Sequence, residues 1–499
     1  MTIFRFIPNK IQFTTSKKAI WFFFVICLVL TVWTRKNGFD GYQFGQEIGN
    51  VSASLASGKG FSNVFDPNSG PTAWTPAFYT SIYAVIFIIF GVKSVYSYWI
   101  LFFLRCFLLA ITFQLALKIN YSHFNKYKFL LLPIFLVFAY FVILKRGMDD
   151  VIFNVFLSMT LIYVISKLFD DGFRKVKAIL YLLALIIPLS NISFFIGLFC
   201  FITLTQFKLQ LPQIPRRHAV TLLIIMMMAI SGWGLRNRSA LNQFIPFKSN
   251  LWFELYLSNV KDDDGILKFT NFRENHPLSN SEVRERYKTL GETKFMEKYK
   301  TASLDYLAEN SIDFLGKAVN RALSIFVWTE FNINNVAPVA IGQLEEEDIE
   351  KLEAQALILN REWICIDLSS RAFESKISAL NLINQVPVLQ DWKARKKQNR
   401  KAKLKLNNLA VGFLMSALPS MALITCLLIP GVRRNRLFLV TLGLFLITIG
   451  PYLIISFHTR YQLFQMSFFV IFVFFALATL IDRFLPGLVD KMVSANTQS

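Results

Sequence analysis

Long apolar blocks separated by short charged segments form the main pattern along the chain. Most blocks approach the ~20 residues that an α-helix needs to cross the hydrocarbon core of a membrane. The pattern therefore predicts an all-α, polytopic, multi-pass integral membrane protein with about ten transmembrane helices. The predicted spans cover residues 19–33, 95–117, 129–144, 151–166, 178–207 (two short helices with an outward turn near Ser190), 219–233, 408–430, 437–456 and 462–481.

Basic residues beside these blocks predict the orientation of the chain. Lys17 and Lys18 precede the first block, which we expect to be a retained signal anchor with the N-terminus in the cytoplasm. The basic loops 118–128, 167–177 and 208–217 are then all cytoplasmic, provided that Ala77–Phe90 does not cross. Because Ala77–Phe90 has only 14 residues, we expect it to be a surface or re-entrant helix.

The polar segments divide the chain into three parts. Residues 1–233 are predicted to be an N-terminal transmembrane module with a first outward loop at 34–94, followed by an extracytoplasmic polar region at 234–407 and by C-terminal transmembrane helices and a short cytoplasmic tail at 408–499. One feature conflicts with this map. Trp392–Lys405 contains eight Lys or Arg residues, and the positive-inside rule favours the cytoplasm for it. An extra crossing around 319–328 resolves this conflict but moves Arg433 outside, so both arrangements stay open.

Composition supports a membrane protein and argues against other classes. Hydrophobic residues make up 54% of the chain, more than a soluble protein of this length carries. The net charge is +21, but most Lys and Arg residues flank apolar blocks, which suits contacts with membrane lipids and not with nucleic acid. Four of the five cysteines lie inside apolar blocks, so no disulfide framework is expected. The chain lacks a Walker loop, an HExxH motif and a GxSxG motif.

The first outward loop begins with an aspartate and continues as an amphipathic segment. Phe44, Ile48, Val51 and Leu55 recur at helical spacing, which predicts a helix lying on the membrane surface with Asp40 just before it. Asp40 has two interpretations at this point: a helix-capping or first-turn acid, or a chemical group facing outward.

Several motifs together resemble the GT-C glycosyltransferases, closest to bacterial relatives of protein mannosyltransferases and of the aminoarabinose (lipid A) transferases (glycosyltransferase family 39-like). An Asp after the first span is followed by a helix ending in Gly-Lys-Gly-Phe and then by a Pro-aromatic helix closed by Phe-Gly. Further similar segments are Trp233–Asn250, Glu274–Lys300 and His458–Phe464. The likeness covers about residues 17–330 and 408–482, whereas residues 335–405 resemble an insertion.

The resemblance implies a GT-C type fold and sugar transfer from a polyprenyl-phosphate-linked donor to a lipid, glycan or protein acceptor. It places the active site on the extracytoplasmic side of a bacterial-type plasma membrane. Asp40 matches the family's first-loop aspartate and is predicted to be the general base. Asp149 and Asp150 match the region of its second acidic site and are candidates to orient the acceptor or a metal. Because family members differ in metal use, a divalent metal ion stays an open possibility, with no ligand set assigned.

Three further residues are candidates to bind the donor phosphate: Arg460, Tyr461 and Arg236. Arginine's planar fork suits phosphate oxygens. For each of these sites snorkelling toward lipid head groups is the alternative interpretation, and for Asp149 and Asp150 the alternative is a favourable interaction with the helix dipole.

A multi-span transporter or lipid flippase is the main rival. Such a protein is expected to show internal repeats, broken helices and several charges at mid-membrane depth. The sequence shows only Arg105 deep within a span and no matching halves. A scaffold protein without chemistry is a third class, which has no need of Asp40 at the start of an outward helix.

Overall fold

The computed structural model describes residues 17–34, 44, 46–144, 149–207, 211–262, 264–267, 271, 274–326, 417–457 and 459–485. Asp40, the predicted insertion 335–405 and the basic run 392–405 lie outside the described residues. The described part consists of helices, with two isolated β-bridges and no strand, which confirms the all-α class.

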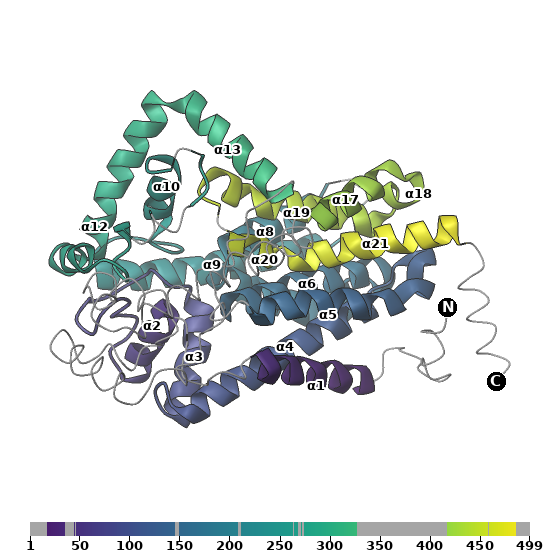
Figure 1. Ribbon diagram of the computed structural model, residues 1–499, viewed down its shortest axis with the longest axis horizontal. Coiled ribbons are helices and arrows are strands. Elements are labelled where there is room, and N and C mark those ends of the chain that lie inside the picture. Colours follow the sequence, from purple (N-terminus) through teal and green to yellow (C-terminus); the bar gives the residue numbers. More distant parts are fainter. Residues whose placement is uncertain are drawn as a thin grey trace, which may run out of the picture.

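Five described helices are long and apolar enough to cross a membrane, so the protein is membrane-embedded. They are α4 (Val95–Lys118), α6 (Asp149–Asp171), α9 (Arg216–Leu241), α19 (Arg436–Ile454) and α21 (Met466–Phe484). Shorter helices pack in the same bundle (Figure 1), namely α1 (Lys17–Thr34), α5 (Leu131–Leu144), α7 (Phe173–Ile186), α8 (Ile192–Leu204) and α17 (Leu418–Leu428). The total of ten spans stays a prediction.

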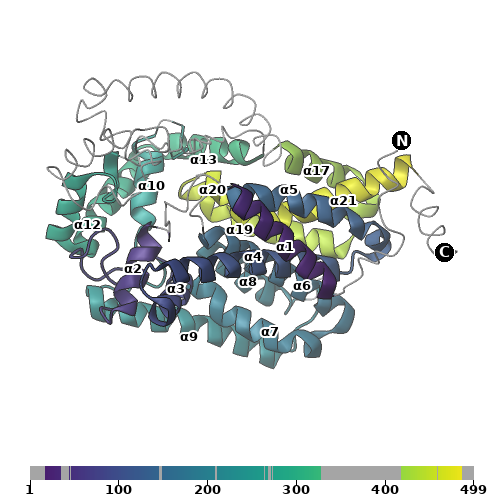
Figure 2. The same ribbon diagram turned by 60° about the horizontal axis from the view of Figure 1, so that its bottom comes forward.

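The apolar stretch 178–207 is broken near Ser190, as its sequence predicts. Helix α7 ends in a short 3₁₀ turn, Ile187–Leu189, and α8 then begins with the Asn191 side chain accepting a hydrogen bond from the Ser193 amide. Helices α7 and α9 lie side by side along one edge of the bundle (Figure 2).

The predicted cytoplasmic loops gather at one end of the bundle, which we call the basic end. The Asn120 amide donates to Asp170 at 3.0 Å, which joins the loop after α4 to the end of α6. In the 3₁₀ helix η2 (Ser122–Leu130), Lys126 pairs with Asp482 at the end of α21. His218 at the start of α9 packs on Phe173 at the start of α7, with ring centroids 4.6 Å apart.

The described part of residues 34–94, for which we keep the predicted name first outward loop, lies at the opposite end, which we call the polar end. Phe23, near the start of α1, stacks on Phe113, near the end of α4, with ring centroids 4.6 Å apart. These two packed helices therefore run antiparallel, and both the end of α1 and the start of α4 lie at the polar end. The chain between them contains α2 (Gln46–Ala56) and α3 (Ala77–Phe90), and α3 runs across the direction of α6 and α21 (Figure 1). This arrangement agrees with the surface or re-entrant helix expected from its 14 residues.

Helix α2 forms where the sequence predicts it, but its apolar face is covered by protein. Val51 is fully buried and Phe44 is 3% exposed. Val51 packs into a second hydrophobic core with Trp74 and Phe253, and the Ser52 hydroxyl donates to the Thr80 carbonyl of α3. The expectation that this face lies on lipid is therefore wrong, because residues distant in the sequence compete for it.

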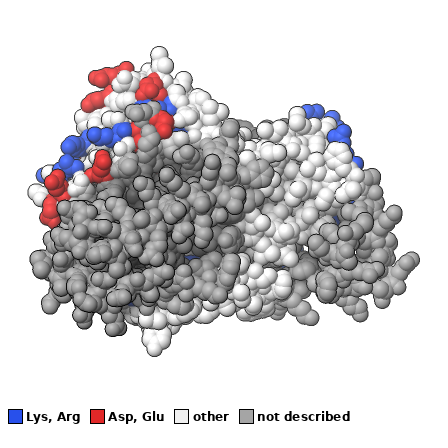
Figure 3. Space-filling model, in the orientation of Figure 1, with Lys and Arg blue, Asp and Glu red and all other residues white. Residues whose placement is uncertain are grey.

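The polar region packs against this loop through that second core. It contains α10 (Leu251–Asn259), α12 (Ser281–Glu309) and α13 (Ser311–Phe326); α12 and α13 form an arch above α10 (Figure 1). Phe295 and Tyr299 of α12 pack edge-on to Tyr287 and Phe253, respectively. The described surface in view carries charged side chains toward its two ends and is largely uncharged between them (Figure 3), as expected for a belt that faces lipid.

Candidate functional site

A cavity of about 330 Å³ lies where the polar end of the membrane helices meets the polar region. Its walls come from the starts of α3, α6, α8 and α10, from the end of α19, from α12 and from α20 (Thr459–Phe464). Its volume falls at the lower end of the ~300–1,000 Å³ typical of small-ligand pockets. Among the described residues, the charged side chains that line it are Asp150, Lys248, Glu254, Glu297 and Lys300.

Four helices begin at this cavity. Ala77, Asp150, Ile192 and Leu251 all line it, and each lies in the first turn of its helix. The first backbone N–H groups of a helix have no partner within the helix, and the helix dipole adds partial positive charge there. Together these helix starts favour negative charge in the cavity, from a bound anionic group or from a first-turn acid such as Asp150.

A hydrogen-bonded cluster fixes one wall of the cavity. The Tyr79 hydroxyl of α3 lies 2.7 Å from the Ser190 carbonyl oxygen and 3.2 Å from Oδ1 of Asn154. The Asn154 amide donates to the Asp150 carbonyl at 2.7 Å. These contacts hold the starts of α3 and α6 against the break between α7 and α8.

Glu254 on the first turn of α10 is held by two neutral donors. Its Oε1 accepts from the Asn250 amide at 2.7 Å and its Oε2 from the Tyr461 hydroxyl at 2.8 Å. The Tyr461 ring stacks on Tyr452 with centroids 4.6 Å apart, and the Asn191 amide donates to the Tyr452 hydroxyl at 3.2 Å. This chain of contacts joins α8, α19 and α20 to the polar region.

The structure brings two of the predicted site residues to the cavity. Asp150 and Tyr461 both line it. Helix α6 includes Asp149 and α20 includes Arg460, but the described part of the chain does not include either side chain. Asp40 also lies outside the described residues, so its role stays a prediction.

Arg236, the third candidate for the donor phosphate, holds the first outward loop. Its guanidinium donates to the carbonyl oxygens of Thr72 at 2.8 Å and Phe61 at 2.7 Å. The guanidinium also lies 5.2 and 5.3 Å from the ring centroids of Phe61 and Trp233, which contact each other edge-on at 4.9 Å. These contacts give Arg236 a structural role, and it is not among the residues that line the cavity.

Glu254 and Lys248 are among the lining residues that were not predicted as site residues. Glu254 is the one acid in the otherwise apolar run Leu251–Leu257, and a lone carboxylate among apolar residues is costly unless it has a partner or a function. That pattern is a usable signal. Lys248 is half-buried and has no comparable sequence signal.

Glu292 joins α12 to the first outward loop. It is 2% exposed, and it accepts hydrogen bonds from the Ala73 amide at 2.7 Å and from the Tyr287 hydroxyl at 2.6 Å. Gly291 has a φ of +73°, which breaks the regular helix just before it. Glycine adopts this conformation at little cost, so Gly291 and Glu292, within the similar segment Glu274–Lys300, have a structural explanation.

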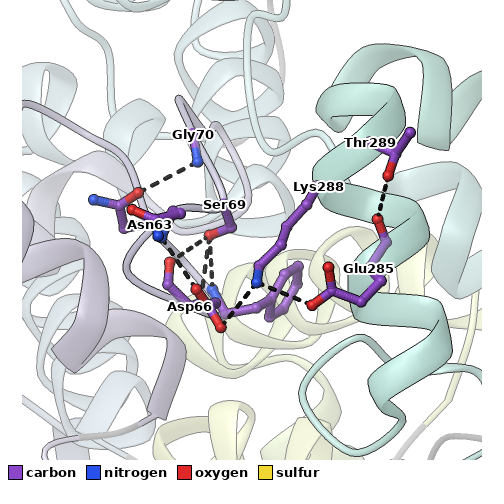
Figure 4. A network of polar contacts seen from close by, with 9 residues as sticks. Asn63, Asp66, Ser69, Gly70, Glu285, Lys288 and Thr289 are labelled. Carbon is purple, nitrogen blue, oxygen red and sulfur yellow. Dashed lines mark hydrogen bonds and ion pairs between the residues drawn. The ribbon is translucent and has the colours of Figure 1, made fainter.

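Three further contacts reinforce this joint. Lys288 of α12 pairs with Asp66 of the loop at 3.2 Å (Figure 4). Glu47 of α2 accepts from the Trp74 indole at 3.0 Å and lies 3.0 Å from His276 Nε2. Because the Leu278 amide donates to Nδ1 of His276, a neutral His276 carries its proton on Nε2, facing Glu47.

Glu292 is expected to make stability depend on pH. Its burial raises the pKa of the carboxyl above the ordinary value of 4.5. A carboxyl whose pKa is raised by folding contributes stability that is present below pH 4.5 and lost as pH rises through the folded pKa. We therefore expect Glu292→Gln to flatten the pH dependence of the unfolding temperature between pH 4.5 and the pKa of Glu292 in the folded protein. An unchanged pH profile would show that Glu292 is not responsible.

No group of three or more His, Cys, Asp or Glu side chains in the described part of the chain is placed to hold a metal ion. Asp40 and the side chain of Asp149 lie outside the described residues.

No family model, curated protein or solved structure matches the chain. The likeness to GT-C enzymes therefore rests on the sequence motifs and supports a proposal of function.

Proposed function

We propose that the protein is a membrane glycosyltransferase of GT-C type. It transfers a sugar from a polyprenyl-phosphate-linked donor to a lipid, glycan or protein acceptor at the outer face of the membrane, with Asp40 as the general base. The polar end of the bundle is the extracytoplasmic end in this proposal, and the basic end faces the cytoplasm, in accordance with the positive-inside rule.

The observation that carries the proposal is the position of the cavity. Its walls come both from helices that are apolar enough to span a membrane, such as α6 and α19, and from the polar region, through α10 and α12. A polyprenyl-phosphate sugar has an apolar tail and a polar head, so its reaction requires a polar pocket directly beside the hydrocarbon phase. A cavity at this junction meets that requirement.

The lining groups suit the reaction. The acceptor hydroxyl loses its proton to the base while its oxygen forms a bond to the anomeric carbon. The bond from that carbon to the phosphate oxygen breaks, and the polyprenyl phosphate leaves with the electron pair. Stabilising that anion requires cations or N–H donors. Lys248 and the starts of α8 and α10 line the cavity and are available for this, and Arg460 stays a candidate from the sequence.

A transfer assay tests the proposal. The full chain, purified in proteoliposomes, is given polyprenyl-phosphate sugars carrying radiolabelled hexoses or pentoses together with a membrane extract as acceptor. We expect label to move from the donor lipid to an acceptor, with release of polyprenyl phosphate. Liposomes without the protein are the control.

The same vesicles distinguish the rival function. Movement of the labelled lipid between leaflets without cleavage of its sugar–phosphate bond would replace the transferase proposal with a flippase. A bundle that moves a lipid head group across the membrane is expected to hold several charges at mid-membrane depth. In the described part of the chain, Arg105 occupies such a position, and it donates to the Tyr83 hydroxyl at 3.0 Å.

A further inference from the structure

We propose that Glu254 binds the sugar ring in the cavity by accepting hydrogen bonds from its hydroxyl groups, with Asn250 and Tyr461 as positioning residues. This inference rests on the proposed function, because it names the carboxylate that recognises the transferred or accepting sugar. The ligand it requires is a polyhydroxylated, uncharged sugar ring.

The capping of α10 gives the first argument. Asn250 occupies the N-cap position, where an asparagine side chain normally accepts a hydrogen bond from a backbone amide of the first turn. Here it makes no such bond, and its amide donates to Glu254 Oε1 at 2.7 Å instead. The helix thus gives up a stabilising cap while its neighbouring carboxylate is oriented. Departures from a local stability rule of this kind concentrate at functional sites.

The rigidity of Tyr461, the second donor to Glu254, gives the second argument. Tyr461 is 7% exposed and its ring lies nearly parallel to that of Tyr452, at 24°. Its hydroxyl is therefore fixed in place when it donates to Glu254 Oε2. Contacts from two different parts of the chain, residues 250 and 461, fix one carboxylate at the wall of a cavity. A carboxylate needed only for solubility requires no such support.

The carboxylate retains capacity to bind a ligand. An ionised carboxylate has about four acceptor positions, and the two described donors use two of them. No lysine, arginine or histidine nitrogen among the described side chains lies within ion-pair distance of Glu254, so both of its described partners are neutral. Hydroxyl groups that donate to an ionised oxygen form stronger hydrogen bonds than neutral pairs do.

The surrounding wall completes a sugar site. Trp233, Phe247 and Trp252 also line the cavity. Aromatic faces pack well against the C–H face of a sugar ring, while the carboxylate binds its hydroxyls. A few polar groups in a largely apolar pocket are the usual basis of orientation and specificity.

Binding can be measured without turnover. Because Trp233 and Trp252 line the cavity, the tryptophan fluorescence of the purified full chain is the readout. It is titrated with the methyl glycosides of glucose, mannose, galactose and N-acetylglucosamine, and with methyl glucosaminide as a cationic sugar. We expect saturable binding of at least one neutral glycoside, weakened about 10- to 100-fold by Glu254→Gln, because charge-assisted hydrogen bonds are lost.

Two variants separate binding from stability. Asn250→Ser keeps a capping residue but releases Glu254, so we expect weaker binding at an unchanged or higher unfolding temperature. Tyr461→Phe keeps the ring and removes the hydroxyl, and we expect it to weaken glycoside binding as well. Glu285→Gln, an exposed carboxylate of α12 outside the cavity, is the matched control. Wild-type binding by Asn250→Ser and Tyr461→Phe would overturn the positioning roles.

The inference and the proposed function fail separately. Absence of saturable binding, wild-type affinity in Glu254→Gln, or binding of methyl glucosaminide alone would overturn the sugar-hydroxyl role, even if the protein transfers sugar. Conversely, binding that depends on Glu254 without any transfer by the wild-type protein would overturn the transferase proposal and keep the sugar site.

Discussion

Replacing Asp40 with asparagine is expected to lower the rate of sugar transfer by about 10²- to 10⁴-fold, the usual contribution of a general base. The asparagine side chain has nearly the same shape but cannot take up the proton of the acceptor hydroxyl. The attacking oxygen then reacts as a neutral hydroxyl, which is a weak nucleophile. The measurement is the initial rate of transfer from a saturating polyprenyl-phosphate sugar in proteoliposomes.

A matched variant in the same loop controls for the loss of an acidic residue. Asp66→Asn makes the same change of charge, and it removes an ion pair with Lys288 whose two side chains are partly exposed, at 27% and 22% (Figure 4). Because ion pairs that solvent screens contribute about 0–1 kcal/mol, we expect near wild-type transfer. If Asp40→Asn is as active as Asp66→Asn, Asp40 is not the base, and the carboxylates that line the cavity become the next residues to test.

Replacing Arg321 with alanine is expected to destabilise the folded protein by about 3–5 kcal/mol, because several buried oxygen acceptors lose their donor at a cost of about 1–3 kcal/mol each. Arg321 is fully buried. Its guanidinium donates to the Leu453 carbonyl at 2.6 Å, the Ile454 carbonyl at 3.2 Å and the Asn259 side-chain oxygen at 2.9 Å. The first two are among the last carbonyls of α19, which have no partner within their helix.

Arg321 therefore joins α13 to the end of α19 and to α10. Burial lowers the pKa of its guanidinium to about 10, so it is still charged at neutral pH. Lysine keeps the charge but lacks the planar fork, and Arg321→Lys should recover only part of the stability. The measurement for both variants is the decrease in unfolding temperature in detergent, and Arg238→Ala, at an exposed position, is the control.

A second variant disturbs the contacts of Arg321 without removing a charge. Gly265 has a φ of +78°, and an added Cβ would lie 2.7 Å from Lys317 Cβ and 2.9 Å from the Arg321 guanidinium. Gly265→Ala is therefore expected to be destabilising as well. Wild-type stability of both Arg321→Ala and Gly265→Ala would show that the contacts of Arg321 do not stabilise the packing of the polar region on α19.

The positions of the membrane helices could be predicted because hydropathy acts locally. The span predicted at 95–117 is a helix at Val95–Lys118, and the stretch 178–207 breaks at Ser190. Helix α9, in contrast, continues to Leu241, well past the predicted end at Trp233. Hydropathy marks the part of a helix that faces lipid, and the last turns of α9 lie in the polar region, where Arg236 and Asn237 bind loop carbonyls.

Part of the candidate site could be predicted, and the missing part has a definite cause. Asp150 was identified through the resemblance to GT-C enzymes, since it matches the region of their second acidic site, and it lines the cavity. Glu254 acquires its environment from Tyr461, 207 residues further along the chain. No local pattern encodes such a contact.

The sequence alone determined that this is an all-α, membrane-embedded protein, and it placed the basic loops that gather at one end of the bundle. Each of these follows from the free energy of moving single segments between water and lipid, which depends on local composition. Tertiary structure decided that α2 is covered by protein, that Arg236 and Glu292 hold the first outward loop and that Glu254 faces a cavity. Those outcomes depend on which distant side chains pack together and satisfy one another's hydrogen bonds, and only the folded chain brings them into contact.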